Sequence, residues 1–315
     1  MARADRAFTM LVAVALVSSA VLVALLLTLL PHLERLVVSG AADVSDVVAV
    51  LVLFLAALGI ALGLAALLRQ LIATALLIRR LLGRRIPVPA AVRVAAHEAG
   101  LAGRIDVVED ARAFSFCYWF LRPRICLSTA LVGRMEPDEL TAVLLHERCH
   151  LRRRDPLRLV VARYFAAGLY VIPLVEELLA YYTLEKELEA DQDAVAELGS
   201  VGPLARALYK VLPDADDVSL GLLVPVGSLS VTEARIDQLV EGREVPLRLS
   251  PAAVALSAGA LIAAAVLAAG HAPLSLVALP AALAAPGLLL APASLLFAAA
   301  ISGGSQQLRA VISRR

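Results

Sequence analysis

A His-Glu-x-x-His motif occupies residues 146–150, so that His146 and His150 stand four residues apart. On a helix this spacing places both imidazoles on one face, where they can hold one zinc ion. Glu147, next to the first histidine, can reach the water that the metal activates and act as its general base. The alternative is a helix with two solvated or core histidines, and the complete motif makes that the weaker interpretation.

The motif needs a helix to carry it, and the flanking sequence predicts one from Pro137 to about Arg154. Pro137 suits a first helical position, and Asp138 and Glu139 follow in the first turn, where the helix dipole favours anions. Apolar residues then recur at the spacing of a buried helix face. Pro156 disfavours helical geometry at the preceding residue, so the helix should end there.

A third metal ligand is expected downstream, in a run dense in carboxylates. Glu185, Glu187 or Glu189 could complete a site of two histidines and one glutamate, with a fourth position open to water. Spacing alone does not choose among the three, and a solvated acidic face is the alternative. Asp191 lies one turn beyond Glu187 and could orient a ligating imidazole.

Residues 146–155 and 187–191 together resemble the M56 family of integral-membrane zinc metallopeptidases, which are related to the M48 membrane proteases. Residues 121–128 and 231–239 resemble the segments that these proteins carry before and after the zinc helix. The resemblance implies that Glu187 is the third zinc ligand. It also implies zinc-dependent endopeptidase activity on a protein substrate.

Cysteine use and charge agree with this interpretation. The three cysteines, an odd number, fit a reducing compartment rather than a disulfide framework. Cys149 is an unusual residue at its position in the motif, which leaves its redox sensitivity open. The formal net charge of +1 argues against direct nucleic acid binding. The pair His97-Glu98 has no second histidine four residues on, and we interpret it as a solvated helix face.

Hydropathy predicts a multi-pass protein of the cell membrane. Hydrophobic residues make up 60% of the chain, and the mean hydropathy is +0.83. Two long apolar stretches come first, and a second pair closes the chain; each is long enough to cross a bilayer core of about 30 Å. The four predicted spans are residues 8–30, 47–68, 252–270 and 274–301.

The spans divide the chain into an N-terminal transmembrane hairpin (1–83), a metallopeptidase domain (84–250) and a C-terminal hairpin with a short basic tail (251–315). Arginines after the second span, at positions 79, 80, 84 and 85, place that end in the cytoplasm. The catalytic domain and both termini are therefore expected to be cytoplasmic. The predicted fold is an α-helical membrane protein with an α+β, zincin-like cytoplasmic metallopeptidase domain.

Within that domain, residues 105–108 and 114–120 are rich in β-branched and aromatic residues and are predicted strands. The second strand, with Phe114, Phe116 and Tyr118, could align a substrate backbone as an added strand. An ordinary core strand is an equally good interpretation. Residues 157–175 should form one helix, buried in the domain or partly embedded in the membrane, and residues 199–222 have the composition of a linker.

Three functions remain open at this stage. The first is regulated cleavage of a cytoplasmic transcriptional repressor, which the resemblance to the short M56 members favours. The second is quality control of membrane proteins, as in the M48 group. The third is a zinc-binding membrane sensor without catalysis, although the general base Glu147 has no use in such a protein.

Overall fold

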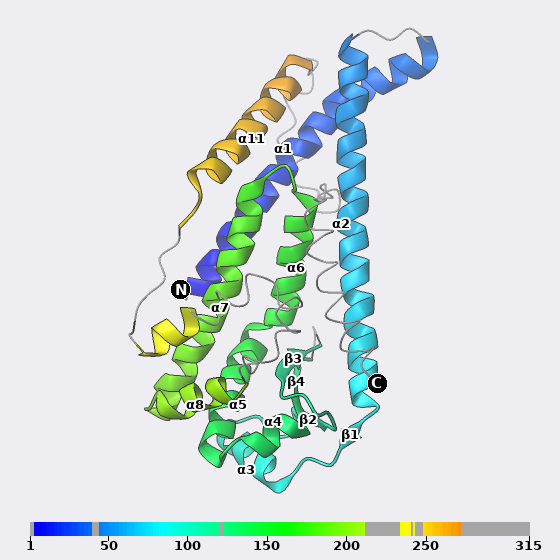
Figure 1. Cartoon of the computed structure of the whole chain (residues 1–315). Coiled ribbons are helices and arrows are strands. Elements are labelled where there is room, and N and C mark those ends of the chain that lie inside the picture. The colour runs from blue at the N-terminus through cyan, green and yellow to red at the C-terminus, as the bar shows by residue number, and fades with distance from the viewer. Residues whose placement is uncertain are drawn as a thin grey trace.

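The computed structural model describes residues 3–39, 44–119, 122–211, 234–240, 242 and 248–271. Long helices form an upright bundle, and a small mixed sheet with short helices lies at one end of it (Figure 1). The elements are α1 (Arg3–Ser39), α2 (Val44–Leu82), β1 (Arg85–Ile86), α3 (Ala90–Glu98), β2 (Ile105–Val108), β3 (Ser115–Tyr118), β4 (Arg124–Ser128), α4 (Thr129–Arg134), α5 (Pro137–Arg153), α6 (Asp155–Gly168), α7 (Pro173–Leu198), α8 (Gly202–Val211) and α11 (Pro251–His271).

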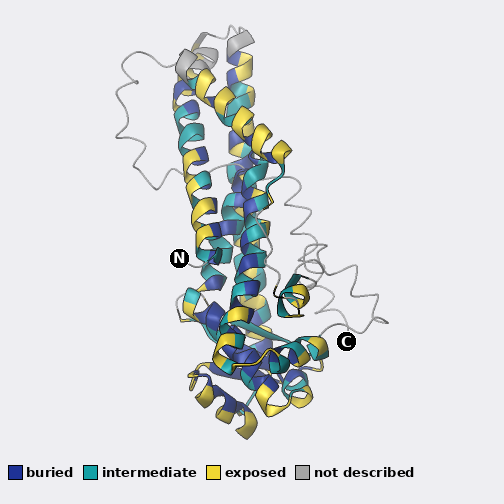
Figure 2. Cartoon of the chain, turned by 90° about the vertical axis from the view of Figure 1, so that its left-hand side faces the viewer, coloured by how far each residue is buried: buried dark blue, intermediate teal, exposed yellow. Residues whose placement is uncertain are grey.

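Among the described residues, three helices are long and apolar enough to cross a membrane: α1, α2 and α11. Their exposed residues follow the outer faces of the bundle, and their buried residues lie where the helices meet (Figure 2). The predicted spans 8–30, 47–68 and 252–270 fall inside these helices. Helix α2 continues beyond the second predicted span, to Leu82. The predicted span 274–301 and the basic tail lie outside the described residues.

Helices α6 and α7 form a hairpin between the long helices, with α2 packed along α6 and α1 packed along α7. The prediction of one helix over 157–175 is wrong, because α6 ends at Gly168 and α7 begins at Pro173. Proline favours the first position of a helix, so Pro173 sets where the second helix starts. The hairpin shares an apolar core with α1, in which Leu169, Ile172 and Tyr182 are almost fully buried.

The sheet has the order β1-β2-β4-β3, which places β3 at one edge. Strands β2 and β4 are parallel, and the other two pairs are antiparallel. The predicted strand 105–108 is confirmed as β2. The prediction for 114–120 is confirmed in its centre as β3, which ends at Tyr118 before Trp119 takes a left-handed backbone conformation. Strand β4 was not predicted.

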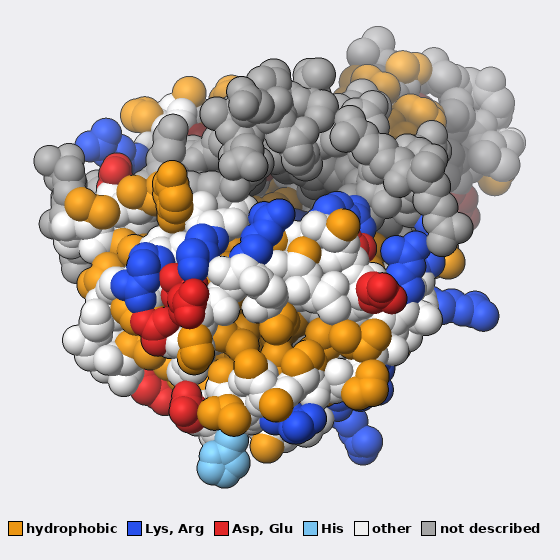
Figure 3. Space-filling model, turned by 60° about the horizontal axis from the view of Figure 1, so that its bottom comes forward, with side chains coloured by type: hydrophobic (Ala, Val, Ile, Leu, Met, Phe, Trp, Pro, Cys, Tyr) orange, Lys and Arg blue, Asp and Glu red, His pale blue; other side chains and the backbone are white. Residues whose placement is uncertain are grey.

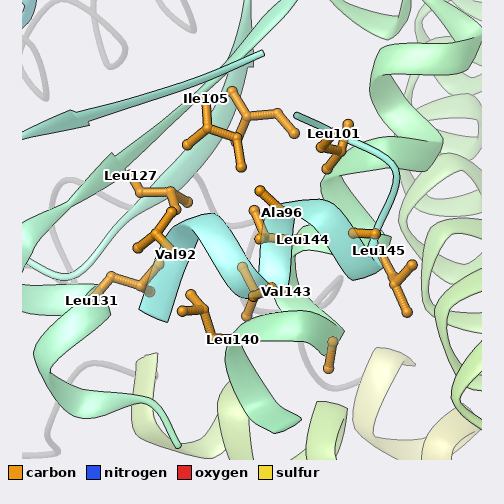
Figure 4. Packing of buried hydrophobic residues seen from close by; sticks show 14 of the residues in the cluster. Val92, Ala96, Leu101, Ile105, Leu127, Leu131, Leu140, Val143, Leu144 and Leu145 are labelled. Atoms are coloured by element: carbon orange, nitrogen blue, oxygen red, sulfur yellow. The ribbon is translucent and has the colours of Figure 1, made fainter. Parts of the chain in front are cut away.

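The core of this end of the molecule lies between the sheet and α5. Leu140, Val143 and Leu144 of α5 point toward Val92 of α3 and Leu127 of β4 (Figure 4). These three α5 residues are the apolar face that the sequence predicted, and all three are buried. The packing fixes the rotation of α5, and the histidines lie on the neighbouring face of that helix, where Val143 borders the same cavity.

Residues 202–211 form α8, so the prediction of a linker over 199–222 is wrong for this part. Leu204 and Ala207 are buried against the same core as α5, which is the tertiary contact that stabilises so short a helix. Viewed from the sheet end, the molecule shows a patch of apolar side chains with groups of basic and acidic side chains around it (Figure 3).

Candidate metal centre

Helix α5 carries the motif, and its start is fixed by a capping box. The side chain of Glu139 accepts from the backbone N–H of Glu136, and the side chain of Glu136 accepts in return from the N–H of Glu139. The helix then runs without interruption through both histidines. His146 and His150 lie one turn apart, as predicted, and their Nε2 atoms are 3.1 Å from each other.

Glu187 of α7 approaches both histidines. Its Oε2 atom lies 3.4 Å from Nε2 of His146 and 3.6 Å from Nε2 of His150. These three side chains are the group of possible metal donors among the described residues, with all donor atoms within 4.8 Å of one another. Zinc bonds of about 2.0–2.1 Å in a tetrahedron separate neighbouring donors by roughly 3.3 Å. The three observed separations match that value, so the donors fit a zinc ion.

The other two candidate glutamates are placed differently. The carboxylate of Glu189 pairs with Arg153 and accepts from the backbone N–H of Ala4. Glu185 is buried, but it is not a member of the donor group. The structure thus brings Glu187, and neither of its neighbours, to the two histidines.

Each histidine faces a second carboxylate through its other ring nitrogen. Nδ1 of His146 is 2.7 Å from Oδ1 of Asp191, as predicted, although its N–H is not well aligned with that oxygen. Nδ1 of His150 is 2.7 Å from Oδ2 of Asp155, which the sequence did not single out. A carboxylate on Nδ1 selects the tautomer whose Nε2 can bind a metal. Both imidazoles are therefore held with Nε2 facing Glu187.

The break between α5 and α6 produces the contact to Asp155. Residues five apart on one straight helix do not share a face, because successive positions differ by about 100°. Arg154 adopts φ 55° and ψ 42°, a left-handed conformation that ends α5 and redirects the chain. Asp155 then begins α6 with its side chain turned back toward His150.

The carboxylates stabilise positive charge at the histidine pair. Burial opposes protonation of both rings, but Asp191 raises the pKa of His146 and Glu187 with Asp155 raises the pKa of His150 to about 9. Burial likewise opposes ionisation of Glu187, yet Lys186 and His150 hold the pKa of its carboxyl well below the ordinary value. A bound cation would replace the protons in the same field.

Two basic residues border the centre, and spacing did not identify either one. Lys186 pairs with Oε1 of Glu187, the oxygen that does not face the histidines. Arg235 donates from Nε and Nη2 to Asp191 at 2.7 and 2.9 Å, and its Nη1 is 3.8 Å from Oε2 of Glu187. Lys186 stands within the acidic run, where only the carboxylates were candidate ligands. Arg235 stands in the segment 231–239, which only the family resemblance marked.

A cavity of about 530 Å³ opens onto these side chains. Its walls come from six labelled elements besides α5: α2, β3, α4, α6, α7 and α8. Glu147 lines it beside both histidines, is buried, and accepts a hydrogen bond of 2.7 Å from Oγ of Ser115. Cys117 of β3 donates from Sγ to the carbonyl oxygen of Glu147 at 3.2 Å. Strand β3 thus lies directly over the part of α5 that holds Glu147.

One edge of β3 pairs with no strand among the described residues, and this edge borders the cavity. The carbonyl of Phe114 accepts from the N–H of Ser128 on β4, so the main-chain groups of alternate residues from Phe114 point to β4. The main-chain groups of Ser115 and Cys117 consequently point away from β4, along the free edge. An added strand could pair with them.

The three aromatic residues of the predicted strand that could align a substrate have different surroundings. Phe114 and Phe116 line the cavity, whereas Tyr118 does not. Tyr118 is buried, and its hydroxyl donates to Asp106 of β2. Of the three aromatic residues named from sequence, two therefore border the cavity and the third stabilises the sheet.

Cys149 lies on α5 but outside the cavity lining, with Sγ 3.3 Å from Oδ2 of Asp193. Burial raises the pKa of its thiol to about 12. Thiolates, rather than thiols, react with oxidants, so this cysteine is poorly suited to a redox function at neutral pH.

The fold and this cavity define a membrane-associated helical protein with an α+β unit of the peptidase type. A family model described as BlaR1 peptidase M56 matches residues 8–209, which are 202 of the 315 residues. The chain belongs to this peptidase family. The match includes most of α1, all of α2 and the hairpin α6–α7 as well as the motif helix, whereas α11 lies outside it.

Two curated relatives are similar over a shorter region. One is named "Protease HtpX homolog", from Moorella thermoacetica (strain ATCC 39073 / JCM 9320), and is 28% identical over 121 residues, with 28% of this chain and 40% of the relative covered. The other is named "Protease HtpX homolog 1", from Streptomyces coelicolor (strain ATCC BAA-471 / A3(2) / M145). It is 33% identical over 87 residues, with 27% of each protein covered. The matched regions span less than half the length of these relatives.

Proposed function

We propose that this protein is a zinc-dependent membrane endopeptidase. The observation that carries the proposal is the convergence of His146, His150 and Glu187 at tetrahedral separations beside Glu147, in a cavity bordered by a free strand edge. Two nitrogens and one oxygen are the donor set of a catalytic zinc with an open position. Membership in a peptidase family supports peptide bonds as the target.

When bound, the zinc would polarise the scissile carbonyl and acidify a water molecule. Glu147 would serve as the base that accepts a proton from water and as the acid that donates it to the leaving amine. The hydrogen bond from Ser115 holds the Glu147 carboxylate in one orientation for both transfers. Asp155 and Asp191 keep the two imidazoles in the tautomer that binds metal.

The substrate would bind as an extended segment along β3. Main-chain groups of Ser115 and Cys117 are available to such a segment, and pairing through the main chain gives affinity with little demand on sequence. Gln70 and Thr74 of α2 also line the cavity, and both belong to a candidate membrane span. This proximity favours a peptide near the membrane surface as the substrate.

We also propose that the peptidase unit lies in the cytoplasm. Helix α2 ends next to the sheet with Arg79 and Arg80 in its last turn, and positive residues favour the cytoplasmic side. A cytoplasmic transcriptional repressor as substrate rests on the family resemblance alone. Cleavage of membrane proteins, the alternative, gains support from the position of α2 at the cavity.

The test uses the full chain in lipid nanodiscs, as wild type, Glu147→Gln and Glu98→Gln. Glu98 makes the matched control, because it is an exposed glutamate on α3 whose substitution changes the same atoms. Zinc content is measured first, and cleavage of casein and of a tethered juxtamembrane peptide second. We expect stoichiometric zinc in all three proteins, and cleavage by the wild type and Glu98→Gln only.

Cleavage that persists at the wild-type rate in Glu147→Gln would refute the role of Glu147. Absence of zinc from the wild type would refute the metal centre. Preference for the tethered peptide over casein would support a membrane-proximal substrate, and the reverse preference would contradict it.

A further inference from the structure

The first turns of α1 pack against the elements that support the candidate metal centre. Ala4, Ala7, Leu11 and Ala15 are almost fully buried on α1, in the core that α1 shares with α6 and α7. Small side chains let the helices approach closely. The backbone N–H of Ala4 donates to Oε2 of Glu189, two residues beyond Glu187. The beginning of α1 is thus fixed at the level of the metal ligands.

A chain of contacts connects α1 to His150. The ring of Phe8 packs on the ring of Tyr182, with 5.3 Å between centroids. The hydroxyl of Tyr182 donates to Oδ1 of Asp155 at 3.2 Å, and Oδ2 of Asp155 is 2.7 Å from Nδ1 of His150. Phe8 has a second contact, because the guanidinium carbon of Arg158 lies over its ring, 5.3 Å from the centroid.

The ion pair between Arg158 and Asp5, at 2.5 Å, anchors the same turn of α1. Two residues in this series of contacts, Phe8 and Asp155, are each held from two sides. Phe8 lies between Arg158 and Tyr182, and Asp155 lies between Tyr182 and His150.

Because Tyr182, Asp155 and His150 are buried, bulk water cannot replace a contact that is lost. Tyr182 is fully buried, so no bulk water can take the place of its hydroxyl. Asp155 is also buried, and each of its oxygens has a partner among the described residues, the phenol for one and the imidazole for the other. Without the phenol, the carboxylate could rotate and release Nδ1 of His150. Without Phe8, the phenol ring would lose the surface that holds it in place.

We propose that Tyr182 and Phe8 are positioning residues for the metal ligand His150, and that α1 sets the metal affinity through the contacts Phe8–Tyr182–Asp155–His150. The inference rests on the proposed metal centre. It gives the first membrane helix a function beyond anchoring, since a displacement of α1 changes the orientation of a zinc ligand.

The experiment measures zinc affinity by chelator competition on the full chain in lipid nanodiscs. The variants are Tyr182→Phe, Phe8→Ala and the double variant. Phe54→Ala is the matched control, because Phe54 is an exposed phenylalanine on α2. Leu11→Ala controls for stability, because it truncates a buried side chain one turn further along α1.

We expect Tyr182→Phe and Phe8→Ala each to weaken zinc binding by about 3- to 10-fold, less than the 10- to 100-fold typical of a direct partner of a ligand. The double variant should bind no more than about twofold more weakly than Tyr182→Phe, because Phe8 acts through Tyr182. Phe54→Ala and Leu11→Ala should stay within about twofold of the wild type, while Leu11→Ala lowers the unfolding temperature.

Wild-type zinc affinity in Tyr182→Phe, or losses that multiply in the double variant, would overturn the inference. A loss in Leu11→Ala equal to that in Phe8→Ala would also overturn it, by showing a general effect of stability. Peptide cleavage by the wild type is measured in parallel. If the variants lose zinc affinity as expected but the wild type cleaves no peptide, the proposed peptidase activity is refuted and this inference stands. If the wild type cleaves peptide but the variants keep the wild-type zinc affinity, this inference is refuted and the peptidase activity stands.

Discussion

Glu139 is a buried carboxylate in the first turn of α5, and it joins that helix to α8. Its Oε2 accepts from the N–H of Glu136 at 2.9 Å and from Nζ of Lys210 at 2.6 Å, and its Oε1 accepts from Nε of Arg206 at 3.1 Å. Leu208 and other residues of α8 form a wall of the cavity. The substitution Glu139→Gln should therefore release α8 and open the cavity.

The magnitude follows from the contacts and their exposure. A hydrogen bond to a charged group contributes about 1.5–3 kcal/mol, and removing one partner of a buried pair costs about 3–5 kcal/mol. The side chain of Lys210 is 33% exposed and that of Arg206 is 53% exposed, so water compensates for part of the loss. Glutamine also keeps one acceptor oxygen. We expect a net loss of about 2 kcal/mol, equivalent to roughly 30-fold in the opening equilibrium of α8.

The assay is hydrogen exchange of the α8 amides, which reports the free energy of local opening. Asp138→Asn is the matched control, because Asp138 pairs with the same Arg206 at 2.5 Å but is half exposed. An exposed pair contributes less than about 1 kcal/mol, so exchange in this variant should rise no more than about fivefold. Equal acceleration by both substitutions would refute the argument, since burial would then make no difference.

Three further predictions concern the centre and the sheet. Glu187→Gln should weaken zinc binding by at least about 100-fold in a chelator competition, whereas Glu189→Gln should stay within about threefold, because only the first is placed as a ligand. Ser115→Ala should lower kcat by roughly 10-fold with little change in KM or zinc affinity, because Ser115 contacts the proposed general base Glu147 and no proposed metal ligand; a change confined to KM would contradict this. Burial disfavours ionised Asp106, but Arg124 and Tyr118 more than offset it and lower its pKa. The stability that Asp106 contributes is therefore fully present above its ordinary pKa of about 3.9 and is lost as the pH falls through the lower, folded-state pKa. In chelator-treated protein, the difference in unfolding free energy between wild type and Asp106→Asn should shrink as the pH falls below about 4, and a difference that stays constant from pH 6 to 3 would contradict the assignment.

The motif helix could be predicted closely because its signals are local. Proline, acidic residues and apolar spacing gave a helix from Pro137 to Arg154, and α5 runs from Pro137 to Arg153. Helix existence depends on residues a few positions apart, so one segment contains all the information. The same reasoning failed for α8, because the tertiary contacts of Leu204 and Ala207 outweigh its linker-like composition.

The choice of the third candidate ligand shows the limit of such local signals. Glu185 and Glu189 are four residues apart and share one face of α7, whereas Glu187 lies on the opposite side of the helix. Sequence spacing gives these two faces but not the rotation of α7 against α5. Packing decides that rotation, and only the family resemblance, which reflects packing common to many chains, pointed to Glu187.

Asp155 illustrates the same limit for a single residue. Pro156 predicted correctly that the helix would break near Asp155. The left-handed conformation of Arg154, which turns Asp155 back to His150, depends on where α6 packs and has no signal in the sequence. Lys186 and Arg235 were missed for the same reason, since each approaches Glu187 only in the folded chain.

Hydropathy separates membrane helices from the rest of the chain, but the candidate metal centre depends on both. Phe8 of α1 supports Tyr182, Thr74 of α2 lines the cavity, and α7 carries Glu187 while packing along α1. Apolar length determines which segments can enter a bilayer, and it contains no information about the side chains at their inner ends. Thr74 lines the cavity, and in our proposal Phe8 positions a metal ligand, so α1 and α2 would serve the candidate site as well as the anchor.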